Sequence, residues 1–381
     1  MTDREITVVG AGLAGLSAAI TLQNAGRAVR VVEAGDRPGG RVSTDLIDGF
    51  TLDRGFQLIN AHYPEIKRLD VISSLNFTEA PRAVDVSMED RRFTVGDPRQ
   101  YLASSLSAAA GTIKEKFNLL RYLVTPSDAT KSVEEELKHL GNLYQRVLSP
   151  FLTGVFLTSP SRINAINGKE IIRSFISGKP GLPADGVGAL PKLLASKIKK
   201  IEYGRRVDSL REFGRGPVIV ATDVTTAAQL LDMTSVPQLA ASTTWYHEVP
   251  KDLSASQRLL IDGQRRGPVV NSILISHLVP TYAPKGKALL SSTTIEFASE
   301  SEVRRHLSLI WGAQSSEWSL IAKYEIPKSL PIFAPGHREI TSSKISDGVF
   351  VAGDYRAAPS QNGALLSGRL AAQSLLFDQR S

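Results

Sequence analysis

The sequence predicts an α/β protein with two discontinuous domains, and three observations lead to this fold class. Its 381 residues exceed what one compact core usually holds. A strand, a glycine turn, a helix and a second strand open the chain, and a strand, a turn and a helix close it. The intervening segments alternate helical and extended patterns of another kind. We expect one domain with a parallel sheet wound by helices, and a second, α+β domain with a mixed sheet and helices.

The opening of the chain has the pattern of a βαβ unit. Residues 6–9 are apolar and rich in β-branched side chains, which favours a buried strand. Small and aliphatic residues at 13–25 predict a helix, and Gly26 suits its C-terminal cap. Residues 28–33 predict a second buried strand. The unit is therefore of the Rossmann type.

A GxGxxG motif lies between the first strand and the helix. Gly10 permits the tight turn out of the strand, and Gly15 lets the helix pack closely. Gly12 lacks a Cβ, so that a diphosphate can approach the backbone. The free N–H groups at the helix start, around Leu13 and Ala14, favour that negative charge. The motif predicts a dinucleotide site.

Two further features extend this site. Glu33 closes the second strand beside Ala34, where a carboxylate can accept hydrogen bonds from ribose hydroxyls. Gly39 and Gly40 follow a few residues later, and the cation Arg41 comes directly after them. A simple NAD-binding fold does not need a second backbone segment that a phosphate can approach. A flavin enzyme does, because the ribityl chain and ring run onward from the diphosphate.

Residues 10–44 resemble the N-terminal signature of the flavin-containing amine oxidase and phytoene desaturase superfamily. Residues 348–354, GVFVAGD, and 361–368, QNGALLSG, resemble that superfamily's last strand and final helix. The resemblance implies a bound FAD. It places Gly353 and Asp354 at the ribityl chain, and the helix start at the edge of the flavin that gains charge on reduction. The helix-start residues are Asn362, Gly363 and Ala364. Because the chain has no cysteine, attachment of the flavin through sulfur is excluded, and we expect non-covalent binding.

Two central segments extend the resemblance. Residues 205–207, before a buried strand at 217–222, resemble a stretch that contacts adenine, here through Val207. Residues 52–57 resemble the segment that passes the flavin ring, which implies that Phe56 and Gln57 lie near it. We therefore expect an FAD domain of residues 1–59, 181–235 and 340–381, with a substrate domain of residues 60–180 and 236–339. The active site should lie between them, at the carboxyl ends of the parallel strands.

Helical patterns fill much of the predicted substrate domain, at residues 100–110, 112–124 and 132–148. In residues 113–124, IKEKFNLLRYLV, apolar residues recur at helical spacing with cations between them. One interpretation is a helix that packs one face on the core. The alternative is a surface helix that touches membrane lipid.

Composition limits the partners and the compartment. The net charge of +7 is spread over short clusters, and no zinc spacing or nucleic-acid-binding motif accompanies it, so we expect no nucleic acid partner. The six histidines are scattered without metal-ligand spacing, so we expect no metal. No apolar run could span a bilayer, and the first residues are not a signal peptide. We expect a cytoplasmic protein, with membrane association limited to peripheral contact.

The resemblance narrows the reaction only in part. The C-terminal segment resembles carotene desaturases, and residues 357–360 lack the aromatic residue that amine oxidases place there. The leading hypothesis is hydride removal from a small, apolar substrate, with an external acceptor such as oxygen or a quinone, because a second dinucleotide motif is absent. The alternatives are an amine oxidase that produces hydrogen peroxide and a non-catalytic flavin-binding protein. No catalytic residue is identified; the candidates are Phe56, Tyr355 and Lys328.

Overall fold

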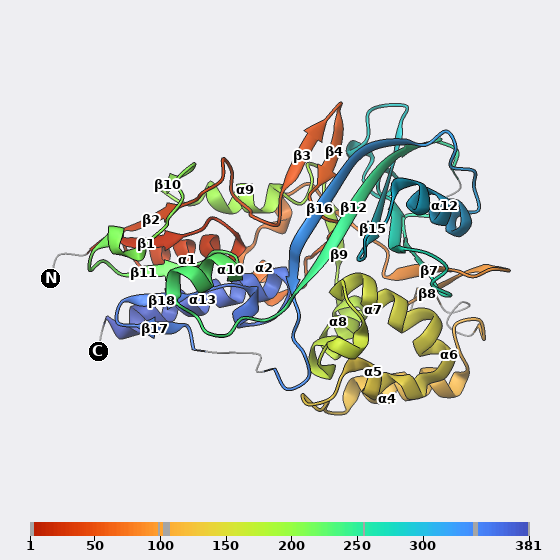
Figure 1. The fold of residues 1–381 in the computed structure, drawn as a ribbon, viewed down its shortest axis with the longest axis horizontal. Helices are drawn as coiled ribbons and strands as arrows, with labels where there is room; N and C mark the ends of the chain where they lie inside the picture. Colours follow the sequence, from red (N-terminus) through yellow and green to blue (C-terminus); the bar gives the residue numbers. More distant parts are fainter. Residues whose placement is uncertain (1–3, 98–99, 102–106, 254–255, 338–341, 380–381) are drawn as a thin grey trace.

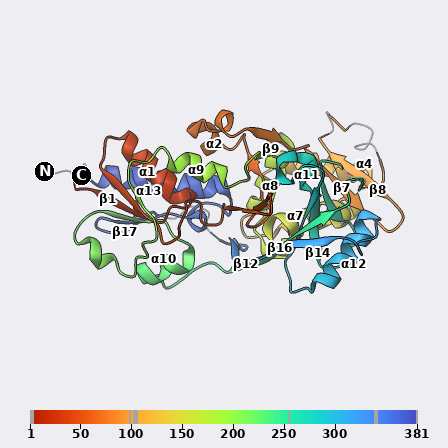
Figure 2. The same ribbon diagram turned by 90° about the horizontal axis from the view of Figure 1, so that it is seen from above.

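Two sheets organise the protein, one toward each end of its long axis (Figures 1 and 2). The computed structural model describes residues 4–97, 100–101, 107–253, 256–337 and 342–379. Both chain ends lie beside the first sheet (Figure 1). The mixed sheet and its helices confirm the predicted α/β fold class.

The first sheet has six strands, and five of them are parallel. The strand order is β10-β2-β1-β11-β18-β17, and only β17 runs antiparallel to its neighbour. The strands are β1 (Ile6–Val9), β2 (Val29–Val32), β10 (Ile201–Glu202), β11 (Val218–Val220), β17 (Lys344–Ser346) and β18 (Val349–Val351). With helix α1 (Leu13–Asn24), β1 and β2 confirm the βαβ unit to within one or two residues. Segments from the start, middle and end of the chain thus form one sheet.

Helices cover both faces of this sheet. On one face, α1 packs against α13 (Gln361–Asp378), and residues of both helices share a core with Val8 and Ile219. On the other face, α10 (Val224–Leu231) packs against Val9 and Val220. Alternating side chains of each strand therefore serve two cores, which explains why these short strands are apolar throughout.

The second sheet has seven strands in the order β16-β12-β15-β14-β13-β7-β8. All its pairs are antiparallel except β13 with β7, so the sheet is mixed. The strands are β7 (Ala83–Ser87), β8 (Arg92–Gly96), β12 (Leu239–Val249), β13 (Leu259–Asp262), β14 (Val269–Leu274), β15 (Ala288–Thr294) and β16 (Ser319–Pro331). The long strands β12 and β16 lean toward the six-stranded sheet (Figure 1).

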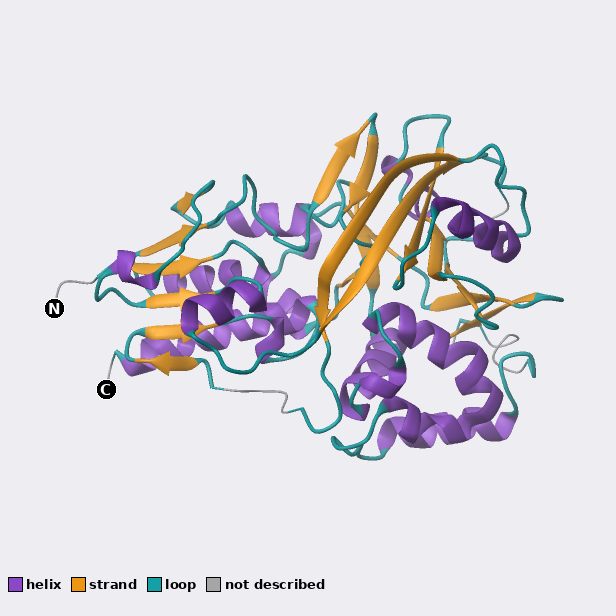
Figure 3. Cartoon of the chain, viewed as in Figure 1, coloured by secondary structure: helices purple, strands orange, loops and turns teal. Residues whose placement is uncertain are grey.

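Three groups of residues cover the second sheet. Helix α12 (Glu300–Trp311) packs on one face with Trp245 and Leu290. The other face meets a helical layer near β7 and β13, and meets the core of the first sheet through Tyr246 and Ile273 (Figure 3). The layer contains α4 (Ile113–Val124), α5 (Val133–Leu137), α6 (Gly141–Leu143), α7 (Ser149–Phe156) and α8 (Ala165–Ser177). The middle of this face, between two apolar cores, is the natural position for a site.

Shorter elements join the two parts. Strands β3 (Thr44–Ile47) and β4 (Phe50–Asp53) form a hairpin, while β5 (Ile59–Asn60), β9 (Pro180–Pro183) and β6 (Phe77–Glu79) form a small sheet. The remaining helices are α2 (Pro64–Leu69), α9 (Ala189–Ala195) and α11 (Ile275–Leu278). None of the helices in the described segments is long and apolar enough to cross a membrane.

The predicted helices of the second part were only partly correct. The helix at 113–124 is confirmed as α4. The predicted helix at 132–148 is wrong as a single element, because it is interrupted at Gly141, whose φ of 52° favours glycine; α5 and a short turn precede this residue, and helical structure resumes from it. Of the predicted helix at 100–110, residues 100–101 and 107–110 form turns or irregular structure, and residues 102–106 lie outside the described residues.

Candidate functional site

The glycine turn after β1 has a geometry that side chains would block. Gly10 has a φ of +105°, and a Cβ there would lie 2.7 Å from the carbonyl oxygen of Ala221. A Cβ at Gly15 would lie 1.9 Å from the carbonyl oxygen of Gly10. At Gly12, by contrast, φ is −70° and an ideal Cβ would have no atom within 4 Å. The tight turn therefore requires glycine at positions 10 and 15, whereas open space adjoins Gly12.

This open space adjoins the N-terminus of α1. Gly12 is the N-cap residue, and no side chain caps the helix. The first N–H groups of a helix have no partner within it, and the positive end of its dipole favours anions. The N–H groups of Leu13 and Ala14 belong to this first turn. The region has the properties of a phosphate site.

A second glycine turn packs against the first. The N–H of Gly39 donates to the carbonyl of Ala11 at 2.9 Å, and Gly39 pairs with Gly12 in a short bridge. Gly39 has a φ of +120°, and a Cβ there would lie 2.2 Å from the carbonyl oxygen of Val42. An ideal Cβ on Gly40 would lie 3.9 Å from the Cα of Gly12. The structure brings the two predicted phosphate segments together.

Glu33 lies at the end of β2, next to the two glycine turns, residues 10–15 and 39–40, which together we call the cradle. Its carboxylate accepts hydrogen bonds from the N–H of Ala11 at 2.7 Å and the N–H of Gly35 at 2.8 Å. These bonds orient the carboxylate, while its neighbour Ala34 is exposed. Val207 is buried in the core beside the ends of β1 and β2. All these predicted residues therefore lie at one end of the sheet.

Arg41 connects three distant segments. Its Nη2 lies 2.7 Å from Oδ1 of Asp354, and its Nη1 donates to the carbonyl of Ser329 at 2.8 Å. Burial lowers the pKa of Arg41, but neighbouring groups, Asp354 foremost, together raise it above the usual value. The N–H of Gly353 donates to the hydroxyl of Ser367 at 3.0 Å, which fixes the turn before Asp354. The C-terminal Gly-Asp turn therefore faces the N-terminal glycine turns.

Gln57 continues this chain of contacts to α13. Its amide donates to the carbonyl of Arg41 at 3.0 Å and accepts a hydrogen bond from Gln361 at 3.0 Å. The side chain of Asn362 accepts from the N–H of Glu65 at 3.1 Å. Ser360 caps α13 by accepting from the N–H of Gly363, and Ala364 packs against the main core. The predicted flavin-passing segment and the start of the last helix thus lie side by side.

The same segment touches the second sheet. The N–H of Phe56 donates to the hydroxyl of Thr244 on β12 at 3.3 Å. Thr244 pairs with Thr293 on β15, and both side chains are buried. Tyr246 lies on the same face, and its hydroxyl donates to the carbonyl of Asp53 at 2.9 Å. Strands β12 and β15 therefore face the end of the first sheet at which the cradle lies.

The three catalytic candidates lie in different places. Phe56 lies between the main core and Thr244. Tyr355 is buried in the core of the first sheet, and its hydroxyl donates back to the carbonyl of Ala352 at 3.2 Å. Lys328 is exposed on β16. Only Phe56 contacts the face where the two parts meet.

Sequence reasoning gave no role to the buried carboxylate of Asp53. It accepts hydrogen bonds from the hydroxyl of Thr44 at 2.5 Å, the hydroxyl of Tyr282 at 2.7 Å and the N–H of Val187 at 3.0 Å. Burial raises its pKa to about 6, although these bonds act in the opposite direction. Its position within the flavin-passing segment, residues 52–57, was the one available signal. Asp53 holds four segments together beside the site.

Replacing Asp53 with asparagine should change the pH dependence of stability. Between pH 4 and 6 the folded protein keeps a proton on Asp53 that the unfolded chain has released. Because the folded state binds this proton more tightly, protonation of Asp53 stabilises the fold. This stabilisation is fully present below about pH 4 and is lost as pH rises through about 6. We expect the free energy of unfolding of the wild type to fall by roughly 2 kcal/mol relative to Asp53→Asn between pH 4 and 7, as each pKa unit is about 1.36 kcal/mol.

Urea titrations at several pH values measure this difference. Asp252→Asn, a substitution at an exposed aspartate, is the matched control and should leave the pH profile unchanged. Parallel pH profiles for wild type and Asp53→Asn would contradict the raised pKa.

Comparison with known proteins agrees with this geometry. A family model described as flavin containing amine oxidoreductase matches residues 13–376. The chain belongs to this family, whose members are flavin-dependent oxidoreductases.

Its relatives include both amine-type and other oxidases. An L-amino-acid oxidase from Daboia russelii is 31% identical over 147 residues, which is 38% of this chain and about a quarter (25%) of that protein. A chloroplastic protoporphyrinogen oxidase from Nicotiana tabacum is 22% identical over 467 aligned residues, covering 93% of this chain and 82% of that protein. A solved oxidoreductase from Methanosarcina mazei shares the fold, with a TM-score of 0.77, 18% identity, and coverage of 98% of this chain and 100% of that one.

Proposed function

We propose that the chain is an FAD-dependent oxidoreductase that removes hydride from a neutral, predominantly apolar small molecule. Bound FAD would supply the hydride acceptor, and an external acceptor such as oxygen or a quinone would reoxidise it. The protein's own contribution is to bind the cofactor, orient the substrate and exclude water. The proposal combines family membership with the side chains that the second sheet presents to the cradle.

We assign a part of FAD to each segment of the cradle. The diphosphate fits beside Gly12 and Gly40, where a cofactor can approach the backbone. Glu33 would accept a hydrogen bond from a ribose hydroxyl, and Val207 would lie near the adenine. Asp354 would accept from a ribityl hydroxyl beside its ion pair with Arg41. The residues of the last helix start, Asn362, Gly363 and Ala364, would meet the flavin edge that gains negative charge, which the helix dipole stabilises.

The domain division expected from the sequence is proposed on the same grounds. The six strands of the first sheet come from residues 6–32, 201–220 and 344–351. The seven strands of the second sheet come from residues 83–96 and 239–331. These ranges support an FAD domain of residues 1–59, 181–235 and 340–381, and a substrate domain of the remainder. The active site then lies where Phe56 meets Thr244.

The side chains on the face of the second sheet that meets Phe56 are neutral, and the substrate assignment rests on this property. Thr244, Tyr246, Thr293 and Asn271 lie on one face by strand pairing, and all are buried. The hydroxyl of Thr293 has no hydrogen-bond partner among the described residues, and a buried hydroxyl of this kind suits a ligand that offers one weak polar contact. A neutral substrate matches such a surface, because an unpaired ammonium would be costly to bury there.

The lysines of the sheet lie elsewhere. Among its seven strands, lysine occurs only in β16, at positions 323 and 328. Lys323 pairs with Trp245 and its Nζ lies 4.8 Å from that ring, on the side that α12 covers. Lys328 is exposed. The resemblance to amine oxidases implies a lysine near the flavin, and neither residue supports it.

Amine oxidation stays the second candidate, because the family model and the L-amino-acid oxidase relative favour it. It predicts peroxide release with amines. A non-catalytic flavin protein predicts a bound flavin that no substrate reduces. These three outcomes are distinguishable in one experiment.

Anaerobic mixing of the FAD-loaded protein with candidate substrates tests the proposal. We expect polyene precursors or porphyrinogens to bleach the flavin, and putrescine or L-amino acids to leave it oxidised. Thr293→Val, which removes the hydroxyl at similar volume, should weaken substrate binding about tenfold and leave FAD binding unchanged. Rapid bleaching by amines, with peroxide formed on return to air, would overturn the neutral-substrate assignment.

A further inference from the structure

Helix α4 carries apolar side chains on its outer side. Ile113, Phe117, Leu120 and Val124 are 75%, 66%, 59% and 79% exposed, respectively. Their spacing of four, three and four residues places them on one side of the helix, and we call them the apolar stripe. Tyr122, on the opposite side, is buried in the core of the helical layer. Packing on the core therefore explains only the inner side of α4.

The charges next to the apolar stripe are positive. Lys114 and Arg121 are exposed, and at 100° per residue both lie along one flank of the stripe. Lys116 lies along the other flank, and its Nζ donates to the carbonyl of Ser107 at 2.5 Å. The acid in this helix, Glu115, points inward. Its carboxylate accepts from the N–H of Thr112 at 2.7 Å and the N–H of Asn142 at 3.1 Å.

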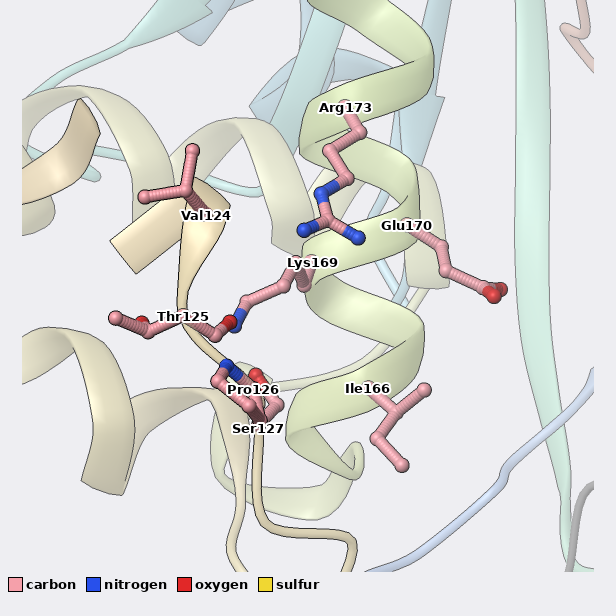
Figure 4. Close-up of a pocket in the computed structure, with 8 residues that line it drawn as sticks. All are labelled: Val124, Thr125, Pro126, Ser127, Ile166, Lys169, Glu170 and Arg173. Atoms are coloured by element: carbon pink, nitrogen blue, oxygen red, sulfur yellow. The ribbon is translucent and has the colours of Figure 1, made fainter. Parts of the chain in front are cut away.

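More positive charge lies at the C-terminal end of the stripe, where Arg173 is exposed and Lys169 is buried. A cavity of about 370 Å³ adjoins Val124, between the end of α4 and helix α8 (Figure 4). Lys169 and Arg173 extend from α8 toward the end of α4, and Glu170 is the acid of this lining (Figure 4). Lys169 donates to the carbonyl of Thr125 at 2.5 Å, and Nε of Arg173 donates to the carbonyl of Leu123 at 2.9 Å.

We propose that the apolar stripe binds the surface of an anionic lipid membrane. Helix α4 lies at an outer edge of the helical layer, where a flat surface can reach it (Figures 1 and 3). Its apolar side chains would enter the boundary between headgroups and acyl chains, while the flanking cations meet lipid phosphates. Lipid of this charge is the occupant that fits, because cations flank the stripe and the chain has a net charge of +7. The contact is peripheral.

Co-sedimentation of the FAD-loaded full chain with vesicles tests this proposal. Vesicles of phosphatidylcholine with phosphatidylglycerol should bind the protein at low salt, and vesicles of phosphatidylcholine alone should bind it far less. The double variant Phe117→Ser/Leu120→Ser should bind about tenfold more weakly, because two apolar anchors are lost. Lys114→Glu/Arg121→Glu should weaken binding similarly and reduce its salt dependence. All four side chains are exposed, so the fold should tolerate these changes.

Phe297→Ser/Leu46→Ser is the matched control, because these side chains are 94% and 75% exposed but lie outside α4. It should bind vesicles as the wild type does. Absence of binding to anionic vesicles at low salt would overturn the proposal, as would equal weakening by the control. Gel filtration without lipid tests the other occupant, a second copy of the chain. If the wild type were a dimer and Phe117→Ser/Leu120→Ser a monomer, the stripe would be a contact between two copies. That result would contradict the lipid assignment.

Discussion

Replacing Gly12 with aspartate should abolish FAD binding while leaving the protein folded. An ideal Cβ at this position has no neighbour within 4 Å, and the φ of −70° is accessible to any residue. Aspartate is a favourable N-cap, so α1 should be as stable as before. Its carboxylate would occupy the proposed diphosphate position, next to the phosphates it repels. We expect the affinity for FAD to fall by about 100-fold or more.

Gly12→Asn separates charge from size. Asparagine caps the helix equally well and has nearly the same volume, but it is neutral. We expect it to weaken FAD binding less than aspartate does. Fluorescence titration of the flavin-free protein measures the affinity, and urea unfolding without FAD measures the fold. Unchanged affinity in Gly12→Asp would mean that the diphosphate does not lie beside this glycine.

Replacing Gly368 with alanine should have the largest effect on stability. A Cβ at this position would lie 1.9 Å from the carbonyl oxygen of Ala14, at the contact between α13 and α1. Because the obstacle is backbone, the two helices must move apart. We expect the free energy of unfolding to fall by roughly 3 kcal/mol. FAD affinity should fall too, since both helices begin at the cradle.

Ser374→Ala in the same helix is the control, and it should change the free energy of unfolding by about 0.5 kcal/mol or less. Urea unfolding of the flavin-free proteins compares the two variants. If Gly368→Ala were as stable as the control, the close approach of α1 and α13 would be incorrect.

The parts of the fold that the sequence predicts are those with local signals. Apolar runs and glycine positions predict β1, α1 and β2, because turn and helix start are fixed by neighbouring residues. The family resemblance adds the final turn and helix. The structure then shows Arg41 against Asp354, 313 residues away along the chain. The family resemblance had implied that both residues lie at one cofactor, although no local pattern connects them.

The remainder depends on contacts between distant segments. Asp53 and Tyr282 are 229 residues apart, and Phe56 and Thr244 are 188 apart, so neither pair has a sequence signature. Thr244 and Thr293 stand in strands whose register decides which face they take. The break at Gly141 was missed because the apolar pattern continues across it. Tertiary packing determines these features.

Direct titration of the purified, flavin-free chain with FAD tests the central claim most simply. We expect one FAD bound per chain, release of unmodified FAD on denaturation, and loss of binding in Gly12→Asp with the unfolding transition retained. A folded protein that takes up no FAD, or that binds it equally well as Gly12→Asp, would contradict the claim that the two chain ends form a flavin site.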